Sequence, residues 1–221
     1  MDPFRKLPAQ TGCLANFSWR WCLASGLGGA VAGWLEGSGW QFSATLLLLG
    51  FSVGLAQSLG LAGFRLPQVM GSCRTFGWGW VAVTGLAWIL AGWVRLGMQP
   101  GLTLLIEGLN PLFSFAGVVW LNFVNEAAQG LGLSLLQWGL YLRRFPLPIL
   151  SWVGVNLLAG ALRGGISAYA CELLCAGPAL GSSGSTAVVY GLGWLAYGGV
   201  TGFWLARWVS GDPSTPKPAP D

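Results

Sequence analysis

Long apolar runs alternate with short breaks of polar, glycine and proline residues along this chain. Each of six runs is close to the ~20 residues that an α-helix needs to cross the hydrocarbon core of a bilayer. The pattern therefore predicts an all-α integral membrane protein with a six-helix membrane domain over residues 19–208. The six expected transmembrane helices cover residues 19–35, 42–64, 76–94, 121–142, 149–170 and 186–208.

The pattern is looser between the third and fourth runs and at both ends. Residues 97–120 are apolar but are interrupted by Asn110-Pro111. Because backbone that is broken at membrane depth must be covered by protein or water, we expect a re-entrant or interfacial segment there. Residues 1–18 are expected to be an irregular cytoplasmic lead-in. The proline-rich residues 209–221 are expected to form a disordered tail.

The first run also fits a signal peptide. Arg5, Lys6 and Arg20 would form its basic region, and Ala30-Val31-Ala32 resembles a cleavage site. The apolar run continues past that site through Trp34, which favours a membrane span.

Composition supports the membrane assignment. Hydrophobic residues make up 54% of the chain and charged residues only 8%, against about 25% charged in a typical soluble protein, and the mean hydropathy is +0.62. The 36 glycines and 14 tryptophans fit as well, because glycine lets membrane helices approach closely and tryptophan gathers at the lipid–water boundary. Four glycine pairs have the spacing of close helix contacts: Gly29-x-x-x-Gly33, Gly50-x-x-x-Gly54, Gly160-x-x-x-Gly164 and Gly198-x-x-x-Gly202.

The basic residues predict the orientation. With six spans, the side that holds the two termini and the loops after the second and fourth spans carries most of the 11 basic residues. The positive-inside rule therefore places both termini in the cytoplasm and the chain in a bacterial inner or internal membrane. The lipid bilayer is then the main partner, and the scattered basic residues do not indicate nucleic-acid binding. The residues on this side are Arg5, Lys6, Arg20, Arg65, Arg74, Arg143, Arg144, Arg207 and Lys217.

The sequence contains no histidine, which excludes haem, chlorophyll and zinc sites with histidine ligands and every mechanism that uses imidazole as a base. Gly181-Ser182-Ser183-Gly184 matches the G-x-S-G pattern of rhomboid proteases, but it has no histidine to activate its serine. We instead expect a flexible loop that leads to a helix cap at Ser185, with anion binding at that helix start as an alternative. No catalytic, metal or cofactor site is expected, and the chain is not expected to be an enzyme.

Five cysteines are present, and none forms a C-x-x-C pair. Cys171 and Cys175 are four residues apart and share one face of a helix. A redox-active pair is one interpretation. Unpaired, small apolar side chains are the commoner state of buried cysteine and are favoured here.

Tryptophan and glycine recur at matching positions of the odd-numbered spans, and glutamine recurs in two even-numbered spans. Gln57 and Gln137 each follow a glycine by seven residues. This recurrence predicts three repeated helical hairpins. The matching pairs in the odd spans are Trp21 with Gly33, Trp80 with Gly92, and Trp152 with Gly164.

One stretch resembles a family of small, uncharacterised bacterial membrane proteins whose copies carry glycine, Gln-Trp, Leu-Arg-Arg and a later tryptophan. The matching residues are Gly130, Gln137-Trp138, Leu142-Arg143-Arg144 and Trp152. The resemblance is specific over residues 130–165. It implies the repeated-hairpin architecture, and it implies no activity.

Arg163 is the residue with the strongest functional interest, because an unpaired guanidinium inside a membrane is costly. Glu126 is expected at a comparable height on the neighbouring helix. We therefore predict an intramembrane ion pair between Arg163 and Glu126, bordered by Asn122, Asn125 and Gln129 in an outward-facing polar cavity. A structural pair is favoured over an arginine that binds substrate.

Gln137 lies six residues before Arg143, about 9 Å along a helix, so its amide is below the lipid headgroups and needs a partner. An interhelical hydrogen bond, with Gln57 as one candidate partner, is favoured over contact with a ligand.

These patterns favour an integral membrane protein that acts as a scaffold or accessory subunit of a membrane assembly. Its partners would be other membrane subunits or further copies of itself. The alternative is a protein that binds or transports a small solute in an outward-facing polar cavity, which by fold-level analogy resembles the substrate-binding subunits of vitamin importers.

Overall fold

The computed structural model describes residues 7–40, 47–60, 73–109, 117–144, 147–175 and 181–209, and these residues form helices and no strands. The expected all-helical fold is therefore confirmed. Two helices, over Gly77–Gly108 and Ile149–Leu174, are long and apolar enough to cross a membrane. The elements are α1 (Leu7–Leu35), η1 (Glu36–Trp40), α3 (Leu49–Gly60), α4 (Cys73–Leu109), α5 (Gly117–Leu140), η4 (Leu142–Arg144), α6 (Ile149–Leu174) and α7 (Gly181–Val209).

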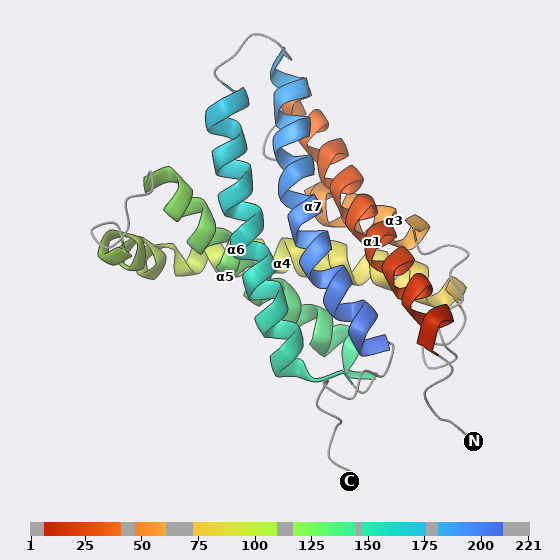
Figure 1. The fold of residues 1–221 in the computed structure, drawn as a ribbon. Coiled ribbons are helices and arrows are strands. Elements are labelled where there is room, and N and C mark those ends of the chain that lie inside the picture. Colours follow the sequence, from red (N-terminus) through yellow and green to blue (C-terminus); the bar gives the residue numbers. More distant parts are fainter. Residues whose placement is uncertain are drawn as a thin grey trace, which may run out of the picture.

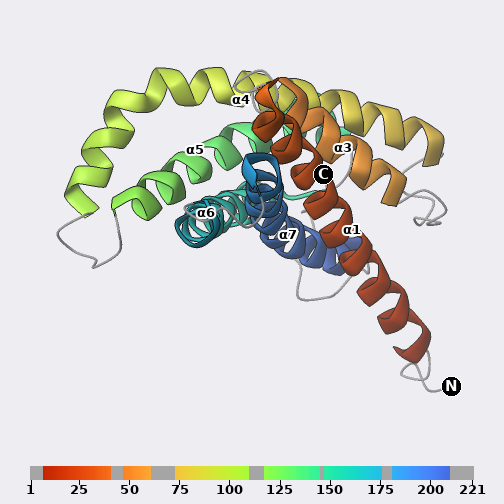
Figure 2. The same ribbon diagram turned by 90° about the horizontal axis from the view of Figure 1, so that it is seen from above.

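Six α-helices of the described residues form a closed ring in chain order. α1 packs on α3, α3 on α4, α4 on α5, α5 on α6 and α6 on α7, and α7 packs back on α1 (Figure 1). Helix α4 runs across α1, α6 and α7 (Figure 1), and it bends into a long arc when seen from above (Figure 2). Such a ring leaves an axis onto which every helix can direct one face.

Glycine makes the close helix contacts possible. A Cβ atom at Gly160 of α6 would meet the backbone oxygen of Glu126 in α5. At Gly28 of α1 it would lie 2.6 Å from the Cα of Val53 in α3, and at Gly198 of α7 it would lie 2.6 Å from the Cβ of Ser25 in α1. Each distance is too short for a real side chain, so these crossings require glycine.

Several helices have bounds that differ from those expected from sequence. Helix α1 begins at Leu7, within the expected irregular lead-in, because Pro8 lies in the first turn, where its missing N–H costs no hydrogen bond. Helix α4 continues through Pro100 to Leu109, so the first part of the expected re-entrant or interfacial segment is an extension of this helix.

Helix α7 begins at Gly181, whose φ of 66° suits glycine. The expected flexible loop before Ser185 is therefore wrong for residues 181–184. Ser185 does not cap the helix start, and its hydroxyl donates to the carbonyl of Leu174 instead. The Asn110-Pro111 break and the expected disordered tail after Val209 lie outside the described residues.

The end of the ring near η4 is closed by aromatic side chains. Trp21, Trp80 and Trp152 are almost completely buried and belong to one core cluster, together with Leu142 and Leu147. The rings of Trp21 and Trp80 lie 5.8 Å apart. This apolar plug separates that end of the ring from the polar region above it.

Candidate functional site

Many of the side chains that face the axis of the ring are polar or aromatic, and they recur at intervals that keep them on one face of their helix. Positions three or four residues apart lie on one face of a helix. Helix α6 directs Asn156, Arg163 and Ser167 inward by this rule, and all three are buried or half-buried. A polar interior therefore runs along a bundle whose outer surface carries large exposed hydrophobic side chains.

A cavity of about 800 Å³ opens at the end of the ring where α6 ends and α7 begins. Its walls come from η1, α3, α4, α5, α6 and α7. We call it the large cavity. Its size is in the range of sites that bind small molecules. Its charged lining residues carry both signs: Glu36, Arg95, Glu126, Arg163 and Glu172.

Arg163 is held on three sides. Its guanidinium forms an ion pair with the carboxylate of Glu126. It also lies 4.7 Å from the ring centroid of Trp88 and 4.7 Å from that of Trp194, which is the geometry of two cation–π contacts. Only 6% of Arg163 is exposed, so the ion pair and the two indoles together replace its hydration.

Arg95 and Glu36 have polar atoms without partners. The Nε of Arg95 and one carboxylate oxygen of Glu36 are buried and make no hydrogen bond within the described chain. Both residues line the large cavity. Because a buried polar atom without a partner is costly, these atoms are suited to receive a ligand or water.

The structure brings together most of the residues predicted around Arg163. Asn122 and Gln129 line the large cavity with Glu126. Gln129 donates to the carbonyl of Trp88 over 3.1 Å, and Asn122 donates to the carbonyl of Val118 over 2.8 Å.

Asn125 does not line the large cavity, although it is buried. It is the neighbour of Glu126, and adjacent residues of a helix point in different directions. The prediction that it borders the cavity is therefore wrong.

Gln57 and Gln137 both make interhelical hydrogen bonds, but not with each other. Gln57 donates to the hydroxyl of Ser25 over 2.9 Å and accepts from the indole of Trp80 over 2.8 Å. Gln137 donates to the hydroxyl of Thr84 over 3.2 Å. The expected kind of contact is present, and the candidate partner Gln57 was wrong for Gln137.

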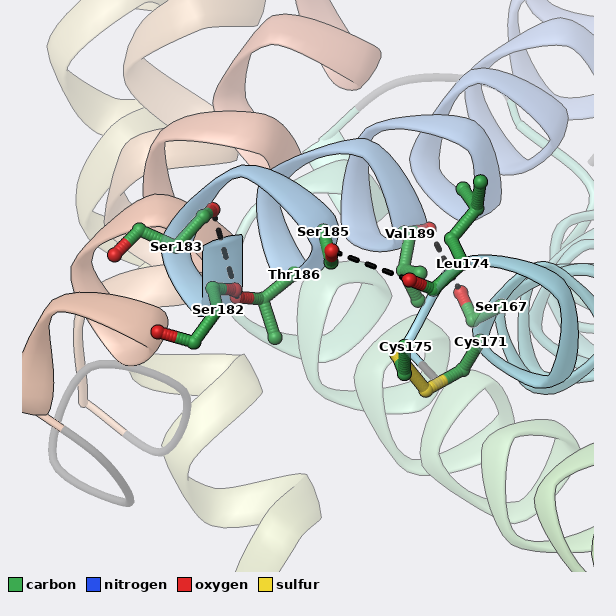
Figure 3. Close-up of a disulfide and its surroundings, with 9 residues drawn as sticks. All are labelled: Ser167, Cys171, Leu174, Cys175, Ser182, Ser183, Ser185, Thr186 and Val189. Atoms are coloured by element: carbon green, nitrogen blue, oxygen red, sulfur yellow. Dashed lines mark hydrogen bonds between the residues drawn. A yellow bond between two sulfur atoms is a disulfide. The ribbon is translucent and has the colours of Figure 1, made fainter. Parts of the chain in front are cut away.

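Cys171 and Cys175 form a disulfide across the last turn of α6 (Figure 3). The expectation of unpaired cysteines is therefore wrong for this pair. Both residues line the large cavity. Two hydrogen bonds between α6 and the start of α7 lie beside the disulfide, from Ser185 to Leu174 and from Ser167 to Val189, each 3.3 Å long.

Sequence reasoning missed the aromatic and charged residues that complete the site. Trp88 follows Trp80 by eight residues and therefore lies on the same helix face, two turns further on. That spacing was a usable signal. Trp194, Arg95 and Glu36 carried no comparable signal, because their relation to Arg163 depends on how the ring closes.

The chain matches no protein-family model, no curated protein and no solved structure. The resemblance over residues 130–165 therefore stays an expectation from sequence. What the site does must be argued from its geometry.

Proposed function

We propose that this chain is a six-span integral membrane protein that binds a small polar solute in the large cavity, as a solute-binding or transport protein. The observation that supports this proposal best is the cavity of about 800 Å³, which has charged side chains of both signs on its walls. A bundle that served only for packing would not need to leave such a volume between its helices.

The membrane assignment rests on which side chains are exposed on the outer surface and which are buried inside the ring. Trp34, Trp93, Leu150 and Phe203 are each more than half exposed and lie on four different helices, whereas Arg163 is buried on the axis. This arrangement suits lipid outside and a polar interior. Both termini are placed in the cytoplasm, the large cavity opens to the opposite side, and three repeated hairpins form the ring.

The charges that remain free indicate the solute class. Arg163 is neutralised by Glu126 and covered by two indoles, so among the described residues that line the large cavity Arg95 is the cation with unused donor capacity. Glu36 supplies unused acceptor capacity on another wall. The apolar wall is aromatic, with Trp88 and Trp194. A small zwitterion with an apolar part matches all three features.

A scaffold or accessory subunit is supported less well. The glycine pairs that favoured it are used inside the chain, for example Gly29 against Trp194 and Gly50 against Trp88. They are therefore not available to pack against another subunit.

Thermal unfolding in detergent with a panel of free amino acids, monocarboxylates and monoamines tests the proposal. A ligand that binds only the folded state raises Tm as its concentration exceeds Kd. We expect at least one amino acid to raise Tm, and Arg95→Gln to abolish that rise. Arg143→Gln, which changes an exposed arginine at the other end of the ring, is the matched control. The proposal fails when no compound raises Tm, or when both variants reduce the response equally.

A further inference from the structure

A second, much smaller cavity lies on the axis between the large cavity and the apolar plug. Side chains from all six ring helices line it, and Trp194 lines both cavities. We call it the small cavity. The space open to the centre of a water molecule is about 10 Å³, which is close to the minimum that holds one water.

Side-chain hydrogen bonds around the small cavity link neighbouring helices of the ring. Five neighbouring pairs are linked in this way among the described residues. The bonds are Ser25–Gln57 for α1–α3, Gln57–Trp80 for α3–α4, Thr84–Gln137 for α4–α5, Asn156–Tyr197 for α6–α7, and Trp21–Thr201 for α7–α1.

Within the described parts of α5 and α6 no such bond is present at this level, although Arg163 and Glu126 join these helices in the large cavity. Each of the two helices instead has one residue that lines the small cavity and carries an unsatisfied polar atom. The Oε1 atom of Gln137 in α5 is an acceptor, and the Nε1–H of Trp152 in α6 is a donor. Gln137 is 2% exposed and Trp152 is 0% exposed, so bulk solvent does not reach either group.

We propose that the small cavity binds one ordered water molecule that accepts a hydrogen bond from Trp152 Nε1 and donates one to Gln137 Oε1. Water is the ligand that fits, because it supplies a donor and an acceptor within a volume too small for any larger molecule. The bound water completes the circle of polar links by joining α5 to α6. This site does not depend on the solute proposed for the large cavity.

The predicted repeat agrees with this assignment. In the alignment of the spans, Gln137 corresponds to Gln57 and Trp152 corresponds to Trp80. Gln57 accepts directly from Trp80 over 2.8 Å. The equivalent pair is not bonded directly, and the water takes the place of that bond.

Trp152→Phe tests the site, and Trp80→Phe is the matched control, because each change removes one indole N–H and the same ring volume from a buried tryptophan. Trp80→Phe also breaks the direct bond to Gln57. If a water molecule accepts from Trp152 Nε1, Trp152→Phe loses a hydrogen bond as well, and it lowers Tm by about as much as Trp80→Phe. If the Nε1–H of Trp152 is simply unsatisfied, Trp152→Phe removes a buried unpaired donor and lowers Tm by about 2–4 °C less than Trp80→Phe, and the proposal is overturned.

A structure of the wild-type chain that resolves ordered water distinguishes a water-mediated link from a direct hydrogen bond. It needs no variant, so it also tests the proposal when a variant does not fold. Density between Gln137 Oε1 and Trp152 Nε1 at hydrogen-bond distance from both supports the proposal. Direct contact between the two atoms, or an empty cavity, overturns it.

Discussion

At the scale of single residues, the most unusual environment is that of Arg163. A guanidinium taken out of water loses several kcal/mol of hydration, and one carboxylate compensates only with good geometry and further contacts. The faces of Trp88 and Trp194 supply these contacts, at about 0.5–2 kcal/mol each. The buried charge is therefore stable only as a four-residue unit with Glu126.

Removing one member of this unit should be costly. We expect Glu126→Gln to lower the free energy of unfolding by about 3 kcal/mol, because it leaves the charge of Arg163 buried and unpaired. The measurement is unfolding in mixed micelles with increasing denaturing detergent. Glu172→Gln, in the same cavity wall but exposed, serves as the control.

The double variant Glu126→Gln with Arg163→Met removes both charges and should recover most of the lost stability. Equal losses in the single and double variants would show that the ion pair is not the source of the effect.

The partners of Arg163 show what can be predicted from sequence at this scale. Glu126 was predicted because depth in a membrane helix follows from counting residues to the arginines that mark its end. Trp194 was not predicted, since it approaches from α7, and no count along one helix tells which residue of another helix faces it. Asn125 was misplaced because direction around the helix was ignored.

At the scale of elements, the α5–α6 crossing positions the ion pair. Gly130 faces the backbone of Asn156, Gly160 faces that of Glu126, and Gly164 faces that of Asn122. These antiparallel contacts repeat every four residues along both helices. They bring the backbones close enough for the side chains of Glu126 and Arg163 to meet.

A methyl group in this crossing should separate the helices. We expect Gly160→Ala to destabilise the protein, since its Cβ would meet backbone of α5, which cannot rotate away. Gly154→Ala on the same helix is the matched control, because nothing lies within 4 Å of the position of its Cβ. It should be neutral or slightly stabilising, as alanine is the better helix former. Measuring Tm of the two variants tests this prediction. An equal change in Tm for both would contradict the need for glycine at the α5–α6 crossing.

The first and last residues of a helix were predictable where the pattern of hydrophobic and polar residues changes abruptly. Helix α6 begins at Ile149 as expected, directly after Pro148. The end of α4 was set too early, at residue 94, directly before the charged Arg95, which lies on the wall of a cavity in the ring. Polar residues mark a helix end only when they face solvent.

At the scale of the whole molecule, the two ends of the ring differ chemically. The disulfide lies at the end where the large cavity opens, and exposed Arg143 lies at the other end. Disulfides persist in oxidising compartments such as the bacterial periplasm. The disulfide and the positive-inside rule therefore favour the same orientation by independent arguments.

Thiol labelling in intact cells tests this orientation. Cys171→Ser frees the exposed thiol of Cys175, which we expect to react with a membrane-impermeant maleimide added outside. The same reagent should label Arg143→Cys only after the membrane is permeabilised. Labelling of Arg143→Cys, but not of Cys175, in intact cells would reverse the orientation.

The packing of α7 against α1 closes the ring between the two ends of the chain. A ribosome makes α7 after the other five helices of the ring, so the face of α1 that carries Gly29 and Gly33 has no partner while the intervening helices are made. The nascent ring stays open until then, and α1 must be kept from pairing with other helices in the meantime. A chain that stops before α7 leaves this face exposed, and cellular quality control should remove such a product.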